Sequence, residues 1–459
     1  MATSDKIIER SLEEELFSND DDVLDSNCSD VEVDIDERHV LPCDSASNSE
    51  IEGDEEADLV ANSQQQSSTL DFSSDDDVPM CELRSRPRKN NYFGKDRFRW
   101  SSTPTSSRAR TFQHNIVQEK EGVKQGYKNV LNSSSSPLDI WNQCFTDDML
   151  EIIVLHTNEK IRSIEPKYTK QVCVQDIDLV EVKAFIRERI ICIMSKNRFE
   201  VLLNVIRFDD SLTRETRRET DPLAPISQLF NYFIKQCQEV YAIGSYACVD
   251  EMLVAYRGRC RFKMYMPKKS AKYGLKIMCL MDARTRYLLN AYIYTGRDSD
   301  GLNLPIEYTR LRKPTQAILR LISCIEGTNR NITTDNWFTS IELANCLKGK
   351  QLTLVGTMRK NQREISSEFL PSRQRQLESS LFGFTSHITI TSFVLKKKVV
   401  VVISSMHHAS NVDEASKKPE IILFYNETKF GVDLVDQRCS NYLTGRRTRR
   451  WPLAIFYTY

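Results

Sequence analysis

The fold of this chain is decided by residues 246–301, which begin Tyr246-Ala-Cys-Val-Asp-Glu-Met-Leu-Val-Ala-Tyr256. Two further apolar runs follow, Gly274-Leu-Lys-Ile-Met-Cys-Leu-Met-Asp282 and Tyr287-Leu-Leu-Asn-Ala-Tyr-Ile-Tyr294. Short β-prone runs separated by turn-length breaks predict an antiparallel meander of three strands. The first run carries Asp250 in its middle, where an unpaired buried charge is costly. Because an acid in such a place usually holds a cation, we expect a divalent metal there.

Length and charge bound the class of protein. The 459 residues exceed one ordinary core, so two or three domains are expected. The net charge of −1 hides an asymmetry, because the first eighty or so residues carry about twenty excess negative charges. The basic remainder favours a nucleic-acid partner. No apolar run reaches the length of a membrane span and the acidic N-terminus excludes a signal peptide, so we expect no membrane partner and an intracellular, nuclear protein.

The 13 cysteines are scattered through the chain. They form no CxxC pair and no cluster with the spacing of zinc ligands. They are therefore interpreted as reduced core residues, and no zinc site is expected in this chain.

The N-terminal third predicts three segments. Residues 1–83 are acidic and poor in aromatic residues, which predicts a disordered tail. Residues 84–135 begin with Arg84-Ser-Arg-Pro-Arg-Lys89 and are interpreted as a basic linker. The basic run could be a nuclear-import signal or an arm that contacts the DNA backbone, or it could be a charged linker without such a role. Residues 136–245 predict a helical domain. Its helices are expected to begin at Pro137, Thr146, Asp178, Ser195 and Ile226, with a loop over the charged run Thr213 to Asp221.

Residues 246–358 continue from the meander into alternating helices and strands. A helix is expected from Leu302 to Ile322, broken or kinked at Pro314. A short strand then ends at Asp335, and Ser340 caps the next helix. Residues 359–426 predict a β-rich segment, and residues 427–445 a last helix that precedes a short piece at 446–459. The strands expected after Asp335 are Leu352 to Thr357, Ile388 to Val394, Val399 to Ser404 and Ile421 to Tyr425.

This order of elements predicts an α/β fold with an RNase H-like core. In that arrangement Asp335 ends a strand beside the strand of Asp250, and Asp433 opens a helix that packs over both. Hard divalent ions such as Mg²⁺ prefer these oxygen ligands, and two ions about 4 Å apart would serve in-line phosphoryl transfer. We therefore predict Asp250, Asp335 and Asp433 as catalytic residues and, with Asp436, as ligands of two Mg²⁺ ions, for which Mn²⁺ is an expected substitute.

Each acid also has a purely structural interpretation. Asp250 could belong to a buried ion pair. Asp335 could cap the helix that follows it, and Asp433 and Asp436 could be first-turn acids that complement a helix dipole. Glu251 and Asp282 are weaker candidates, and Glu251 should point to the sheet face opposite Asp250.

Basic side chains surround the predicted acid site in the sequence. They suit contacts with DNA phosphates, although a solvated charged hairpin would show the same pattern. The residues predicted to bind DNA are Arg257, Arg259, Lys263, Lys268, Lys272, Lys276, Arg446 and Arg447.

Many short motifs, in order, resemble the piggyBac family of DNA transposases. The resemblance runs from about Trp100 to the last residue. Its motifs include Val249-Asp-Glu-Met-Leu, Tyr256-Arg-Gly-Arg-Cys260, Met264-Tyr-Met-Pro-Lys268, Lys272-Tyr-Gly-Leu-Lys276, Thr334-Asp-Asn-Trp-Phe-Thr-Ser340, Gly431-Val-Asp-Leu-Val-Asp-Gln437 and Arg450-Trp-Pro452.

The resemblance implies a cut-and-paste transposase that acts on transposon ends and TTAA targets through hairpinned ends, and that pairs as a homodimer. It implies that 136–245 is a dimerisation and DNA-binding domain and 359–426 an insertion domain, and it places the family's catalytic aspartates at Asp250, Asp335 and Asp433, with a fourth at Asp436. Two departures stand out. A stretch between Phe185 and Met194 is shorter than in the family, and the chain ends soon after Pro452, before the expected further helices and zinc-binding domain. Two other functions therefore stay open: a non-catalytic nuclear DNA-binding protein and a decayed transposase fragment.

Overall fold

A computed structural model describes residues 40–41, 91–104, 116–132, 134–168, 171–186, 194–396, 398–441 and 448–458. The predicted acidic tail, apart from Val40 and Leu41, lies outside the described residues, and so does the basic run 84–89. Arg446 and Arg447 also lie outside them, as do residues 187–193 of the shortened stretch.

The core of the fold is a five-strand arrangement within a larger sheet. Strands β6 (Tyr246–Ala255), β8 (Tyr273–Asp282) and β9 (Leu288–Ile293) form the predicted antiparallel meander. On the other side of β6, β10 (Asn331–Thr334) pairs parallel to it, and β11 (Thr353–Thr357) pairs parallel to β10. The resulting order β9-β8-β6-β10-β11 is that of an RNase H-like core, which confirms the predicted fold class.

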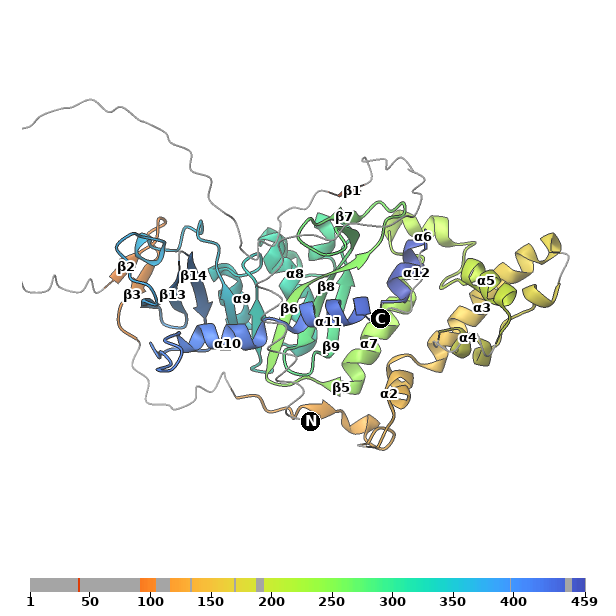
Figure 1. Ribbon diagram of the computed structural model, residues 1–459, viewed down its shortest axis with the longest axis horizontal. Helices are drawn as coiled ribbons and strands as arrows, with labels where there is room; N and C mark the ends of the chain where they lie inside the picture. Colours follow the sequence, from red (N-terminus) through yellow and green to blue (C-terminus); the bar gives the residue numbers. More distant parts are fainter. Residues whose placement is uncertain are drawn as a thin grey trace, which may run out of the picture. The chain divides into compact units, whose positions relative to one another are not determined.

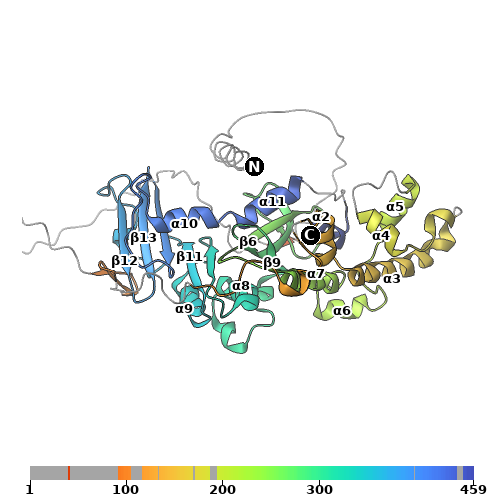
Figure 2. The ribbon, with the colours of Figure 1, turned by 90° about the horizontal axis from the view of Figure 1, so that it is seen from below.

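The side chains of β6 alternate between two apolar layers, as a strand buried on both faces requires. Cys248 and Met252 belong to the layer shared with Val432 of α11 (Gly431–Asn441). Ala247 and Val249 belong to the layer shared with α8 (Lys313–Ile322) and α9 (Ile341–Gly349). Figures 1 and 2 show α11 on one side of the strands and α8 and α9 on the other.

The helix expected from Leu302 to Ile322 is interrupted near Pro314, as the proline predicted. Pro314 lies in the first turn of α8. A 3₁₀ turn (Ile306–Arg310) precedes α8, which begins at Lys313. Proline is tolerated in the first turn because the amide hydrogen it lacks has no partner within the helix.

The helical part begins as predicted. Helices α2 (Pro137–Cys144) and α3 (Asp147–Ile164) are followed by α4 (Leu179–Ile186), α5 (Lys196–Val205) and α7 (Ser227–Val240). Ser136 and Ser195 cap α2 and α5 by accepting hydrogen bonds from the backbone. None of the helices in the described part of the chain combines the length and apolar character that crossing a bilayer requires.

The charged run that was predicted to be a loop is instead helix α6 (Arg214–Thr220). The prediction missed two ion pairs that this segment makes with Asp209, a few residues before it. Asp209 is 1% exposed, and its two oxygens lie 2.6 Å from Arg214 and Arg217, one helical turn apart on α6.

The predicted strand Ile421 to Tyr425 is also wrong, because these residues lie in helix α10 (Glu420–Thr428). Ile421, Ile422, Tyr425 and Thr428 are buried, a spacing that suits one face of a helix. Pro419 precedes the helix as its N-cap. A short apolar run does not by itself distinguish a strand from a buried helix.

The β-rich segment extends the same sheet. Strands β12 (Ser380–Phe384), β13 (Thr389–Leu395) and β14 (Lys398–Ser404) are antiparallel, and β14 pairs with β11. Part of the predicted basic linker forms the hairpin β2 (Asn91–Phe93) and β3 (Arg99–Ser101), and β3 pairs with β12. Trp100 of β3 is fully buried and donates its indole hydrogen to the Glu364 carbonyl at 2.8 Å.

Candidate active site

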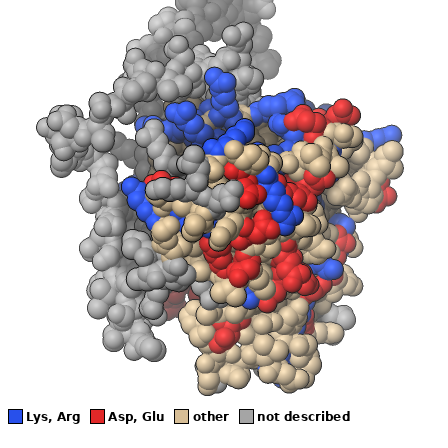
Figure 3. Space-filling model, turned by 90° about the vertical axis from the view of Figure 1, so that its right-hand side faces the viewer, with Lys and Arg blue, Asp and Glu red and all other residues tan. Residues whose placement is uncertain are grey.

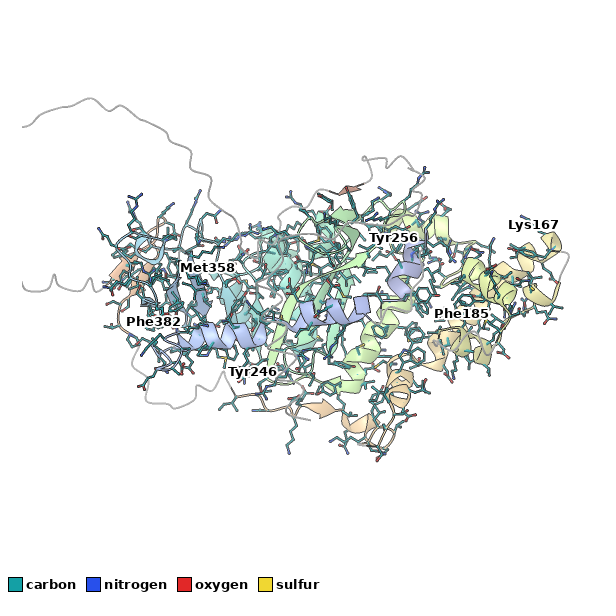
Figure 4. All side chains as sticks on the ribbon, in the orientation of Figure 1. Lys167, Phe185, Tyr246, Tyr256, Met358 and Phe382 are labelled. Atoms are coloured by element: carbon teal, nitrogen blue, oxygen red, sulfur yellow. The ribbon has the colours of Figure 1, made fainter. Side chains whose placement is uncertain are left out.

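Asp250 lies at the centre of β6, opposite Cys279 of β8. Its neighbours on β6 are fully buried, whereas Asp250 itself is only partly buried. One of its oxygens accepts the Glu251 backbone amide at 2.8 Å. Because side chains alternate along the strand, Asp250 projects from the face covered by α11. Figure 4 shows Tyr246 and Tyr256 at the two ends of β6, with α11 crossing between them.

Asp335 comes directly after β10, beside Asp250. Thr334 pairs with Val249, so Asp335 and Asp250 are the next residues along two parallel strands in register. The Asp335 Oδ1 atom accepts the amides of Trp337 at 2.9 Å and Phe338 at 3.4 Å. These bonds close the turn after β10 and orient the carboxylate at the end of the strand. Asp335 does not cap the helix that follows, because Ser340 is the N-cap of α9.

Asp433 and Asp436 lie on α11, which contacts β6 and β8. Asp433 is in the first turn and its side chain is 54% exposed, whereas Asp436 is partly buried. Gly431 brings the start of the helix against the sheet, since a Cβ there would lie 3.2 Å from the Cys248 side chain. The close approach of this helix start brings its acids to the sheet face that carries Asp250.

Lys269 places an ammonium group among these acids. Its Nζ atom donates to Asp433 Oδ1 at 3.2 Å and to the backbone carbonyl of Glu251 at 3.1 Å. Burial lowers the pKa of Lys269, but the charges of Asp433, Asp250, Glu251 and Asp436 outweigh this and raise it. The sequence indicated only that Lys269 belongs to the basic cluster expected beside Asp250, because its contact with α11 joins residues far apart in the chain.

The pKa values show that the acids lie close enough to repel one another. Burial raises the pKa of Asp250 well above its usual range, and Glu251, Asp335 and Asp433 raise it further. Burial and Glu251 raise the pKa of Asp335 to about 7, against the opposing effect of the Trp337 and Phe338 amides. Burial also raises the pKa of Asp436. The site therefore stabilises positive charge.

The chemical type of these ligands, carboxylate oxygens, suits a hard divalent cation. Carboxylate oxygens are the ligands that Mg²⁺ and Mn²⁺ prefer, and the acids already attract an ammonium group. In the part of the chain that the structure describes, no three His, Cys, Asp or Glu side chains are arranged to hold a metal. The exposed Asp433 carboxylate instead contacts Lys269, which supplies the compensating charge.

The competing acids have structural partners. Glu251 is 1% exposed, on the sheet face opposite Asp250, with its carboxylate 3.9 Å from Lys276. Asp282 is fully buried and accepts the amides of Gly244, Arg284 and Thr285. Both carboxylates are thus built into the fold.

The predicted DNA-binding residues divide into two groups. Arg257, Arg259, Lys268 and Lys272 are exposed on the segment between β6 and β8. Lys263 and Lys276 are 5% and 6% exposed, which does not fit the prediction that they contact DNA at the surface. Lys276 lies over the rings of Tyr294 and Trp337 beside Glu251, because its position on β8 faces the apolar layer of α8.

Two further groups near the acids were not singled out in the sequence. Arg359 lowers the pKa of Asp335, and its guanidinium lies 3.4 Å from the Asn336 side chain. Tyr425 of α10 is buried, with its hydroxyl 3.4 Å from Thr357, and the charges of Asp335 and Asp250 help to raise its pKa. The mistaken assignment of α10 as a strand concealed this neighbour.

Comparisons with known proteins agree with the geometry. A family model described as Transposase IS4 matches residues 178–459, a range that contains all four predicted aspartates. Among solved structures, the chain is similar to the piggyBac transposase in a synaptic complex with hairpin DNA. That match has a TM-score of 0.67 and 33% sequence identity, and it covers 74% of this chain and 74% of the other.

Proposed function

Because this chain belongs to the piggyBac family of transposases, we propose that it cuts and joins DNA at TTAA sequences by metal-dependent phosphoryl transfer. One observation carries the proposal. Asp250 and Asp335 lie side by side, because each comes directly after one member of the Val249–Thr334 pair of the parallel strands β6 and β10. Helix α11, which carries Asp433, contacts the same strand β6. The mutual effects of these acids on the pKa of Asp250 support a shared role.

Asp250, Asp335, Asp433 and Asp436 would hold the Mg²⁺ ions, with Mn²⁺ as a substitute. Bound there, such ions would supply charge stabilisation for the attacking and leaving oxygens of in-line transfer. The protein's part is to fix the carboxylates. Strand pairing positions Asp250, the amides of Trp337 and Phe338 orient Asp335, and the close approach of α11 brings Asp433 to the same face.

Exposed cations beside the acids would position the DNA backbone. Arg257, Arg259, Lys268 and Lys272 all lie on the segment that joins β6 to β8. Contacts to phosphates fix the register of a duplex without reading its sequence. We also propose a paired assembly on DNA, for which the similarity to a transposase in a synaptic complex gives support. A nuclear location is proposed with it, because the expected substrate is DNA.

Strand transfer from a linear transposon end flanked by TTAA, in the presence of Mg²⁺, tests the proposal. The wild-type chain should nick the end, form a hairpin and join it to TTAA targets. Asp250→Asn should abolish all three steps while leaving DNA binding intact. Asp298→Asn, which changes a fully exposed acid, is the matched control and should behave as wild type.

Two outcomes would contradict the proposal. Undiminished product from Asp250→Asn would show that the chemistry does not use this site. A wild-type chain that binds DNA but yields no product with Mg²⁺ or Mn²⁺ would favour the alternative of a non-catalytic nuclear DNA-binding protein.

A further inference from the structure

A pocket of about 240 Å³ lies away from the acids, where α5 and α6 meet the start of α12 (Trp451–Phe456). Four arginines and an apolar wall surround it. Its lining residues are Arg207, Phe208, Asp209, Arg214, Arg218, Pro225, Arg450, Trp451 and Pro452.

Positive charge in this pocket exceeds the negative charge that faces it. Among the described residues that line it, Asp209 is the one acid. Both of its oxygens are already engaged, by Arg214 and by Arg217 of α6. Within the described part of the chain, the ion pair of Arg218 is with the exposed Glu215 at 3.6 Å, and the Arg218 side chain is 45% exposed.

The remaining two arginines bind neutral acceptors. Arg450 donates to the carbonyls of Leu203, Asn204 and Ile206 at the end of α5, and Arg207 donates to two of the same carbonyls. These bonds hold the guanidinium groups in place without neutralising them. Burial and the neighbouring arginines lower the pKa of Arg207, and they lower that of Arg450 to about 10. Like charges are therefore held together here by the fold.

The pocket adjoins the segment that carries the exposed cations near the acid site. The Trp451 ring meets Phe262 edge-on at 5.0 Å between centroids. The Tyr256 hydroxyl, just after β6, donates to the Arg449 carbonyl at 2.6 Å. Figure 3 shows Lys and Arg gathered on the upper part of this end of the molecule, the level at which Figure 1 places α6, above a band of Asp and Glu.

We propose that this arginine pocket binds a phosphate of the DNA backbone and extends the DNA path from the β6–β8 segment onto the helical part. The pocket has four arginines, and its one acid, Asp209, is already paired, so the pocket suits an anion. The paired N–H groups of a guanidinium also match the geometry of phosphate oxygens. The apolar wall of Phe208, Trp451 and Pro452 suits the sugar beside that phosphate. This assignment rests on the proposed function, because it takes DNA to be the ligand.

The test measures binding of a fluorescein-labelled DNA duplex by anisotropy, in EDTA and over a range of salt concentrations. Arg218→Gln is the main variant, since its exposed side chain and loose ion pair make it dispensable for folding. We expect affinity to fall about fivefold, and the slope of log affinity against log salt to decrease in magnitude by about one, as for one lost phosphate contact. Arg207→Gln should act in the same direction.

Arg162→Gln is the matched control. Arg162 is 64% exposed on α3 and pairs with Asp176 away from the pocket. Its substitution therefore removes the same charge without changing the pocket. Loss of affinity confined to the pocket variants supports the proposal, and equal binding by wild type and Arg218→Gln overturns it. Because EDTA removes the chemistry, these results do not depend on whether the chain is catalytic.

A second arm separates DNA from free phosphate. Inorganic phosphate is added to wild type and to Arg218→Gln, and thermal unfolding is followed. The assignment is supported if millimolar phosphate displaces labelled DNA from the wild type but not from Arg218→Gln. If phosphate stabilises wild type through Arg218 while DNA affinity stays unchanged in the variant, the pocket is a site for free phosphate and the DNA assignment is wrong.

Discussion

The ammonium of Lys269 lies 3.2 Å from an oxygen of Asp433, a residue 164 positions away in the chain. The same ammonium donates to the Glu251 carbonyl, so one side chain links the loop between β7 (Lys263–Tyr265) and β8 to α11 and to the central strand β6. The acids around it raise its pKa in spite of its burial. Without a metal ion, the protein thus provides an internal cation at the proposed active site.

Lys269→Met should weaken the metal-free protein and make it more responsive to Mg²⁺. Removing the ammonium leaves the acids to repel one another, and because Asp433 is half exposed we expect a loss of only about 1 kcal/mol in the free energy of unfolding. Added Mg²⁺ should restore more stability to the variant than it adds to wild type. Urea unfolding with and without Mg²⁺ measures both effects. Lys272→Met, an exposed neighbour, is the control, and equal Mg²⁺ responses in all three proteins would contradict the expectation.

Asp335 should make the metal-free protein less stable as the pH rises. Its pKa is raised from 3.8 to about 7 in the folded state. Between these two values the folded chain keeps a proton that the unfolded chain loses, so this contribution to stability is full below pH 4 and is lost as the pH rises through 7. Asp335→Asn removes the titration and retains the oxygen that accepts the Trp337 amide. In EDTA at pH 8 the variant should be more stable by about 1–3 kcal/mol, and this gain should vanish near pH 4. Parallel stability–pH curves would show that Asp335 is ionised normally.

Asp209→Ala should be strongly destabilising, because it leaves Arg214 and Arg217 without their buried acid. Because Arg214 and Arg217 are 24% and 37% exposed and can be solvated once the acid is gone, we expect a cost of about 1.5–3 kcal/mol from the lost charged hydrogen bonds. Helix α6 should lose order first, since these pairs are what hold it in place. Chemical denaturation gives the free energy, and hydrogen exchange over 214–220 locates the loss. Glu215→Ala, on the exposed side of α6, is expected to change stability by less than about 0.5 kcal/mol.

Gly356→Ala should disturb the turn that carries Asp335. A Cβ at this position of β11 would collide with the Thr339 hydroxyl and lie 2.7 Å from the Thr334 carbonyl, and these residues flank Asp335. Overpacking of this kind costs about 1–3 kcal/mol, and strand transfer should fall more than stability alone explains. Gly349→Ala is the control, because a Cβ there meets nothing within 4 Å. Full activity in Gly356→Ala would show that the turn tolerates displacement.

The sequence predicted the central strands well because these elements carry strong local signals. The apolar run around Asp250 and the short strand that ends at Asp335 are properties of neighbouring residues. The order of strands and helices then sufficed to predict that both acids lie on adjacent strands, as the register of β6 and β10 shows.

Other features depend on contacts that no local pattern encodes. The run 214–220 is a helix in which Arg214 and Arg217 bind the buried Asp209, and the charged run gave no sign that Asp209 would be buried. Residues 421–425 are apolar enough for a strand, and only the packing of α10 against β11 and β14 decides otherwise. Lys276 and Lys263 resemble surface cations in sequence, but the sheet buries them. Lys269 resembles its exposed neighbours, yet α11 makes it part of the proposed site.

The β2–β3 hairpin has a practical consequence for producing the protein. Trp100 is anchored to Glu364, and the Tyr92 ring meets Phe369 edge-on at 5.1 Å, so the hairpin covers apolar groups next to β12. A recombinant fragment starting at the helical part would remove this cover and expose the apolar groups around Phe369 and the end of β12 at Phe384. Such a fragment should aggregate, and soluble preparations should therefore start upstream of Asn91.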